Sequence, residues 1–238
     1  TNNFCMNIDL KNTDDYINKQ TYPNCDINCI HIQIKNLNKI VSEMSSEIAD
    51  TSWINNLGEL DKLIFNATAE RTIDKVVNEI LSKVSNGLND DIGEYLVSYS
   101  AQNALVSHYN HTKIPLAELL KEKVSGNPGF DFHTISEKRF LIFGEAKFSL
   151  NDTPRAIALD QIGNFIGLKK DYAELNSLKS FIDTDTHSNI VAGRKGYAAA
   201  FSFNAKSIDV IFKNALESEV IGEIAKHNEL YLIAIEVC

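Results

Sequence analysis

Residues 126–148 read GNPGFDFHTISEKRFLIFGEAKF and carry the strongest indication of the fold. Residues 125–129 combine Ser, Gly, Asn and Pro, which mark a turn. Residues 130–135 and 139–148 are rich in β-branched and aromatic side chains and are separated by a short polar stretch. We therefore expect two strands joined by a polar turn, that is, a β-hairpin.

Three charged residues lie inside this hairpin, at Asp131, Glu145 and Lys147. Glu145 and Lys147 are two apart on a strand and so share a face. Carboxylates brought together are unfavourable unless a cation lies between them, and Mg²⁺ or Mn²⁺ prefers such oxygen ligands. Lys147 could orient or deprotonate a water, or stabilise charge on a phosphate. The pattern predicts metal-dependent phosphodiester hydrolysis. The alternative is that the acid and the lysine belong to an ordinary solvated strand edge, which has the same pattern.

The register of the hairpin decides whether this site can form. A three-residue loop at 137–139 places Asp131 directly opposite Glu145, with Cβ atoms about 4.5–5.5 Å apart. A four-residue turn would point Glu145 to the other face of the sheet. We therefore expect an odd-length turn or a β-bulge at Gly144, with Phe132 and Phe148 on the opposite face.

The rest of the chain predicts an α/β fold. Residues 29–34 alternate as a strand does, and 37–84 show the 3–4 residue spacing of amphipathic helices. We expect a helix from about 92 to 108 capped by Asp90 or Asp91, and another that starts at Pro154 with Thr153 as its cap. Strands at 196–203 and 230–237, with a helix between them, complete the pattern. We divide the chain into an acidic, mainly helical portion (1–87) and an α/β domain (88–238).

Composition limits the class of protein. The chain has 238 residues, of which 44% are hydrophobic, so one large domain can form. A net charge of −9 argues against non-specific coating of nucleic acid. The first 100 residues carry 8 basic and 15 acidic side chains, so a surface that faces a polyanion is expected in the C-terminal part. The apolar runs fall short of a membrane span, and the four sparse cysteines fit a cytoplasmic protein.

The segment from Asp131 through Glu145 and Lys147 resembles the core of the PD-(D/E)xK nuclease superfamily, with the nominal Pro-Asp loosened to residues 128–131. The wider run of residues 92–96, 129–133 and 144–148, followed by a helix near Ala156, is similar to the nuclease subunit of the Hachiman antiphage system. The resemblance covers roughly residues 90–170.

This resemblance implies a restriction-endonuclease-like fold, in which helices flank a mixed central sheet. It implies Mg²⁺- or Mn²⁺-dependent cleavage of DNA with low sequence specificity in antiphage defence, controlled by a superfamily 2 helicase. The acidic N-terminal portion is our candidate for the helicase-docking surface. Two alternatives stay open, a catalytically inactive module that binds DNA or acts as a scaffold, and a nuclease that acts on RNA.

Five further residues are candidates for the site. Glu94 would add a metal ligand from the helix before the hairpin, or is an acid favoured by the helix dipole. Gln161 would fix a water or a phosphate, or is an ordinary helix glutamine. His133 would contact substrate, or is a strand histidine with a hydrogen-bond partner. Arg194 and Lys195 lie in a basic turn that would contact a backbone phosphate, or is an ordinary surface turn. Two other groups lack the second ligand pair of a zinc site: His108 with His111, and Cys25 and Cys29 with His31.

Overall fold

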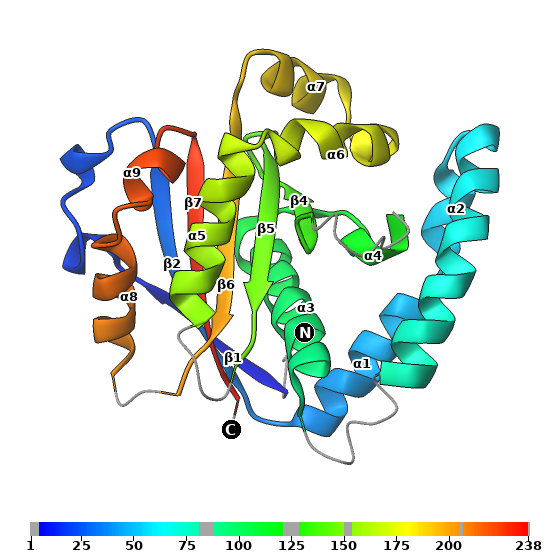
Figure 1. Ribbon diagram of the computed structural model, residues 1–238, viewed down its shortest axis with the longest axis horizontal. Coiled ribbons are helices and arrows are strands. Elements are labelled where there is room, and N and C mark those ends of the chain that lie inside the picture. Colours follow the sequence, from blue (N-terminus) through cyan, green and yellow to red (C-terminus); the bar gives the residue numbers. More distant parts are fainter. Residues whose placement is uncertain (1–4, 81–87, 121–128, 150–153, 205–206, 238) are drawn as a thin grey trace.

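A computed structural model describes residues 5–80, 88–120, 129–149, 154–204 and 207–237. The described chain is a mixed α/β structure built on a seven-stranded sheet of order β1-β2-β7-β6-β5-β4-β3 (Figure 1). Its strands are β1 (Met6–Lys11), β2 (Asp26–Ile34), β3 (Thr112–Lys113), β4 (Phe132–Ile135), β5 (Leu141–Lys147), β6 (Lys195–Ser202) and β7 (Glu229–Val237). Its α-helices are α1 (Leu37–Ala49), α2 (Glu59–Ile73), α3 (Asp90–Tyr109), α4 (Ala117–Leu120), α5 (Pro154–Gly167), α6 (Lys170–Leu178), α7 (Thr184–Val191), α8 (Ile208–Leu216) and α9 (Ile221–Ile224). A π-helical segment, Asp74–Ile80, continues α2.

The centre of the sheet is parallel and its edges are antiparallel. Strands β2, β7, β6 and β5 run in one direction, whereas β1 pairs antiparallel with β2, and β4 with β5. Every residue of β6 is buried, as are the first seven of β7. Near-continuous apolar strands of this kind need helices on both faces. The sheet therefore separates two hydrophobic cores.

Alternate side chains of β7 enter the two cores. Tyr231 and Ile233 face the core that contains α1 and α3, whereas Leu230 and Leu232 face the core of α5 and α8. The same alternation on β5 directs Ala146 toward α3 and, by the period of two, Glu145 toward α5. The direction of each side chain is thus fixed by core packing.

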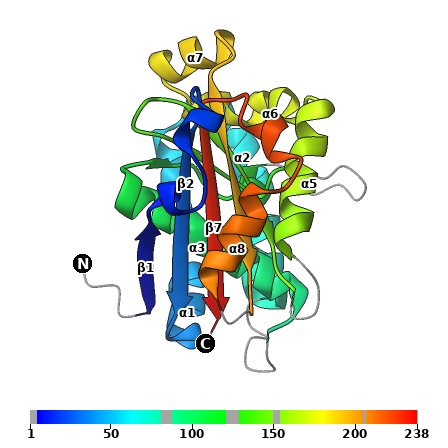
Figure 2. The ribbon, with the colours of Figure 1, turned by 90° about the vertical axis from the view of Figure 1, so that its left-hand side faces the viewer.

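The N-terminal portion is more than a helical appendage. It contains α1 and α2, as expected, but β1 and β2 also belong to the central sheet. β2 pairs with β7 over nine positions, from Asp26 opposite Glu229 to Ile34 opposite Val237. Figure 2 shows β1, β2 and β7 side by side. The proposed boundary at residue 87 therefore separates two portions of the chain that share one sheet.

Most of the predicted elements are present, but the N-cap of one helix differs from the prediction. The predicted strand at 29–34 is the end of β2, and the helix predicted at 92–108 is α3. Its N-cap is Asn89, whose side chain accepts from Ile92 N, in place of the predicted Asp90 or Asp91. Pro154 occupies the first position of α5 as expected. The expected cap at Thr153 and helix end at 85–87 lie outside the described residues.

The hairpin has the predicted register. Phe132 pairs with Gly144 and Ile135 with Leu141, and the same register places Asp131 opposite Glu145. Ser136 N donates to Phe140 O at 2.9 Å, which closes a three-residue loop at 137–139. Arg139 ends that loop with φ 63°, the left-handed conformation common in three-residue hairpins. The prediction of an odd-length turn is confirmed.

Within the described ranges, we find no helix with the length and hydrophobicity required to cross a membrane.

Candidate active site

The candidate site lies at the C-terminal end of β5, which extends beyond its pairing with β4. The pairing of β4 with β5 begins at Phe132 opposite Gly144, so the last three residues of β5 lack a strand partner on that side. Asp131 fills part of the gap. Its backbone N donates to Gly144 O at 2.8 Å, and its carboxylate Oδ2 accepts from Ala146 N at 2.8 Å. The side chain of Asp131 thus occupies the position that a backbone carbonyl would take in a longer β4.

Glu145 is a fully buried carboxylate. Lys147 Nζ lies 2.8 Å from its Oε1, but neither oxygen of Glu145 accepts a well-directed hydrogen bond from the described residues. Burial raises the pKa of Glu145 well above its usual value, the negative charge of Asp131 adds to the rise, and Lys147 opposes it. A buried acid of this kind is unfavourable for folding and is typical of functional sites.

Lys147 joins the hairpin to α3. Its ammonium lies 3.4 Å from Glu94 Oε1 as well as beside Glu145. Burial alone would lower the pKa of Lys147, but the charges of Glu145, Asp131 and Glu94 outweigh burial and raise it. The lysine therefore stays protonated in this arrangement. It is suited to stabilising negative charge and not to removing a proton from water.

Gly93 allows α3 to approach β5 closely. A Cβ atom at this position would lie 2.1 Å from the ring of Phe148, which packs beneath the helix. The close approach brings the next residue, Glu94, within reach of Lys147. The expected grouping of Asp131, Glu145, Lys147 and Glu94 is therefore present, with Phe132 and Phe148 in the core on the α3 face.

The residues fit a divalent cation by their chemistry. Two carboxylates lie within electrostatic reach of each other, and the Glu145 oxygens lack well-directed hydrogen bonds from the described chain. Mg²⁺ is usually bound by one or two carboxylates, together with waters and substrate phosphates. Among the described residues, no group of three or more His, Cys, Asp or Glu side chains is close enough to form a ready-made metal site. An ion would therefore rely on Asp131 and Glu145, with Glu94 reaching it only after a shift of side chains.

His133 lies away from this site. It is 1% exposed, and its Nε2 lies 2.8 Å from Glu174 Oε2 of α6. The other Glu174 oxygen accepts from Phe130 N at 2.9 Å. The structure therefore agrees with the alternative of a strand histidine with a hydrogen-bond partner, because the ring is enclosed between the hairpin and α6.

Arg194 and Lys195 lie at the opposite end of the sheet from Lys147. Lys195 pairs with Leu141, at the start of β5, whereas Lys147 pairs with Phe201. Six residues of strand correspond to about 20 Å. Figure 1 shows α6 and α7 over the end of the sheet where β5 and β6 begin. A phosphate in contact with this turn would therefore be a different one from a phosphate beside Lys147, and the predicted phosphate contact of the turn stays a prediction.

Lys195 has a structural partner in its own surroundings. The side chain is 4% exposed, forms an ion pair with buried Asp171, and lies 3.9 Å from the centre of the Tyr172 ring. Tyr197 OH also donates to Asp171 Oδ2 at 2.8 Å. Arg194 is exposed beside it. No pattern in the sequence indicates this buried cluster, because Asp171 and Lys195 lie 24 residues apart.

Gln161 is half-buried on α5, the helix that packs on β5 and β6. Its place in the helix after the lysine strand agrees with the expectation, but no contact connects it with Glu145 or Lys147. It stays a candidate on its position alone.

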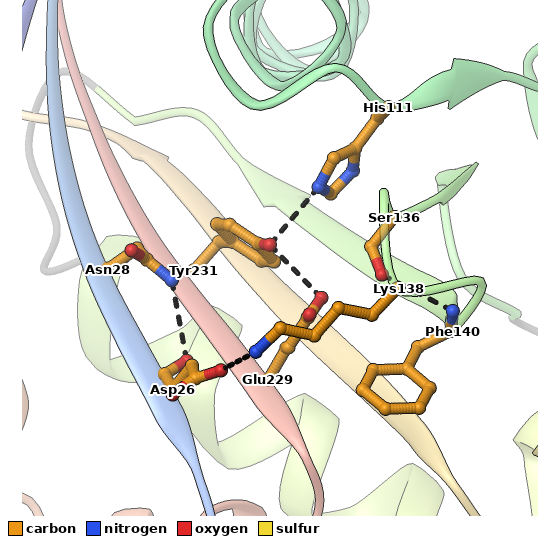
Figure 3. A network of polar contacts seen from close by, with 8 residues as sticks. All are labelled: Asp26, Asn28, His111, Ser136, Lys138, Phe140, Glu229 and Tyr231. Atoms are coloured by element: carbon orange, nitrogen blue, oxygen red, sulfur yellow. Dashed lines mark hydrogen bonds and ion pairs between the residues drawn. The ribbon is translucent and has the colours of Figure 1, made fainter.

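A second polar network lies at the other end of the sheet and was not expected. Tyr231 OH lies between His111 Nε2, at 3.1 Å, and Glu229 Oε2, at 3.0 Å (Figure 3). The other ring nitrogen of His111 lies 2.8 Å from Thr134 Oγ1. These residues come from three separate parts of the chain, around positions 111, 134 and 229–231, so no local spacing in the sequence indicates the network.

Comparison with known proteins adds no assignment. No family model matches the chain, and no curated protein is significantly similar to it.

Proposed function

We propose that the chain is a metal-dependent nuclease that hydrolyses DNA phosphodiester bonds with low sequence specificity. The observation that carries this proposal is the convergence of Asp131, Glu145, Lys147 and Glu94 at the open end of β5. A mixed sheet with helices on both faces, and an antiparallel hairpin that supplies the acids, supports a restriction-endonuclease-like fold of the PD-(D/E)xK superfamily.

Each side chain has a distinct role in the proposed reaction. Asp131 and Glu145 would hold Mg²⁺ or Mn²⁺, and Glu94 would add a carboxylate from α3. When bound, such an ion polarises a phosphate oxygen and lowers the pKa of a bound water. Lys147, kept protonated by its acidic neighbours, would lie beside the scissile phosphate and stabilise the charge that develops in the transition state.

A second candidate is a catalytically inactive module with the same fold that binds DNA or serves as a scaffold. The ion pairs from Lys147 to Glu145 and Glu94 favour it, because they partly neutralise the acids without a metal. The same surroundings would then be purely structural.

A metal-titrated nicking assay separates these functions. The purified chain is incubated with supercoiled DNA, or with a matched RNA, over increasing Mg²⁺ or Mn²⁺ concentrations and then with a chelator. We expect DNA cleavage that saturates with metal and stops on chelation. Cleavage of RNA alone would assign the nuclease to RNA. Absence of cleavage at every metal concentration, with and without the partner discussed next, would support the inactive module.

We further propose that a helicase of superfamily 2 controls this nuclease in antiphage defence, and that it docks on the N-terminal portion. Helix α2 supports this surface. Leu60 and Leu63 are each 71% exposed and Ile64 is 50% exposed, at the spacing of one helix face. On its other side α2 buries Phe65, which packs against Trp53 and Phe181. An exposed apolar stripe of this kind is typical of an interaction site.

Exchange of these leucines tests the docking surface. The double variant Leu60→Lys/Leu63→Lys should fold normally, because both side chains are exposed, and should lose the complex with the proposed superfamily 2 helicase. Val210→Lys, at a 54% exposed position on α8, is the matched control and should leave the complex intact. We expect helicase binding to suppress cleavage by the wild type. Full binding by the double variant would exclude α2 as the docking site.

A further inference from the structure

A cavity of about 530 Å³ opens at the end of the sheet where β2 and β7 begin. Asp26 starts β2 and Glu229 starts β7, and the β4–β5 turn at 136–138 forms another wall. Glu229 shares a face with Tyr231, which packs in the α3-side core, whereas Glu145 points toward α5. The cavity is therefore separate from the candidate active site. Its volume lies within the range of small-molecule sites, about 300–1,000 Å³.

The lysines that line the cavity have ion-pair partners among the described residues, whereas two of its acids have none. Each of its lysines already forms an ion pair within the chain: Lys11 with Asp9, Lys19 with Asp14, and Lys138 with Asp26. By contrast, Glu137 and Glu229 form no ion pair with any described residue, as judged within 4.0 Å. Glu137 is exposed at the rim, and Glu229 is 3% exposed. The unpaired charge of the cavity is thus negative.

The floor of the cavity does not neutralise this charge. Tyr231 OH donates to Glu229 Oε2, and His111 lies against the other side of the same hydroxyl (Figure 3). Burial lowers the pKa of His111 to about 4, so the ring is neutral near pH 7. Lys138 forms its ion pair with Asp26 (Figure 3). Burial raises the pKa of Glu229, and the hydrogen bond from Tyr231 and the charge of Lys138 oppose this rise without an ion pair to the carboxylate.

Aromatic rings complete the lining. Tyr22 and Tyr109 are half-buried and contribute to the walls. The faces of such rings attract organic cations, by about 0.5–2 kcal/mol for each well-placed contact. Asn28 and Ser136 add an amide and a hydroxyl group to the lining. A buried carboxylate beside tyrosine rings is suited to an ammonium or guanidinium group and unsuited to an anion.

We propose that this cavity binds a small organic cation, a protonated amine or guanidinium compound, whose charged group lies at Glu229. The exposed acid Glu137 and the Lys138–Asp26 pair form the rim through which such a ligand enters. This site is independent of the proposed nuclease activity, because it shares no residue with Asp131, Glu145, Lys147 or Glu94.

Isothermal titration calorimetry of the full chain with 1,4-diaminobutane tests the proposal, with agmatine as a guanidinium probe. We expect one site per chain for at least one of the two cations. The neutral analogue 1,4-butanediol should bind at least tenfold more weakly. Glu229→Gln keeps an acceptor for the Tyr231 hydroxyl but removes the charge, and should weaken cation binding at least tenfold. Lys138→Met removes a competing cation and should strengthen binding severalfold, which a merely structural role of Glu229 would not explain.

The control is Glu219→Gln, an exposed acid outside the cavity, which should change the affinity less than twofold. Thermal unfolding of each variant shows whether it is folded. If Glu229→Gln unfolds, Lys138→Met and Glu137→Gln decide the matter, since the latter should weaken binding at the rim. The proposal is overturned if neither cation binds the wild type, if 1,4-butanediol binds as tightly, or if folded Glu229→Gln binds like the wild type.

Discussion

Replacement of Gly93 by Ala tests the packing that brings Glu94 to Lys147. The added Cβ would lie 2.1 Å from the Phe148 ring, whereas ordinary contact begins at 3.4 Å, so helix or ring must retreat by about 1.3 Å. Overpacking of a core usually costs about 1–3 kcal/mol. Replacement of a helical Gly by Ala otherwise raises the unfolding free energy by about 0.5–1 kcal/mol, because Ala loses less conformational entropy on folding. We therefore expect a net loss of about 1–2 kcal/mol of unfolding free energy.

This loss is measurable by guanidinium unfolding and as a fall in Tm. For a chain of this size, each kcal/mol corresponds to about 2–4 °C, so the Tm should fall by about 2–8 °C. Gly167→Ala is the control, because a Cβ at that position of α5 meets nothing within 4 Å. Displacement of Glu94 should also lower the rate of DNA cleavage, by up to about a hundredfold for a shift near 1 Å. A Gly93→Ala protein as stable as the wild type would refute the placement of α3 on Phe148.

Three further predictions concern buried charges. Glu145→Gln should stabilise the fold at pH 8 and progressively less as the pH falls, because the wild type loses unfolding free energy as the pH rises from the pKa of Glu145 in the unfolded chain toward its raised pKa in the fold. Equal unfolding free energies of both proteins across this range would contradict this prediction. As the pH falls from 6.5 to 4, the wild type should lose about 3 kcal/mol of unfolding free energy relative to His111→Gln, because burial lowers the pKa of His111 to about 4. His108→Gln, at an exposed position, is the control and should follow the wild type. Lys195→Met should lower the unfolding free energy by about 3–5 kcal/mol, because it leaves Asp171 buried without its cation. Arg194→Ala, at the adjacent exposed position, should leave the unfolding free energy unchanged.

The hairpin could be predicted because its determinants are local. The three-residue loop at 137–139 and the alternation on both strands fix the register, and the register brings Asp131 to the level of Glu145. Helix α3 followed from its periodicity, but its cap was misplaced by one or two residues, because Asn89, Asp90 and Asp91 all suit that position.

The errors concern contacts between distant parts of the chain. The pairing of β2 with β7 joins residues about 200 apart in sequence, and no local pattern indicates it. A basic turn at Arg194 has the same appearance at either end of a strand, and only the parallel pairing of β5 with β6 shows which end it occupies. The two alternatives for His133 stay open in the sequence because its partner, Glu174, comes 41 residues later on α6.

The proposed role of the buried carboxylate of Glu145 is to hold a metal ion for catalysis. Its most direct test is the rate of Mg²⁺- or Mn²⁺-dependent DNA cleavage by Glu145→Gln, measured beside the wild type and Glu217→Gln, an exposed acid on another part of the surface. We predict that Glu145→Gln stays folded and loses at least about 10²–10³-fold in rate, while Glu217→Gln keeps the wild-type rate. Cleavage by folded Glu145→Gln at the wild-type rate would contradict the claim.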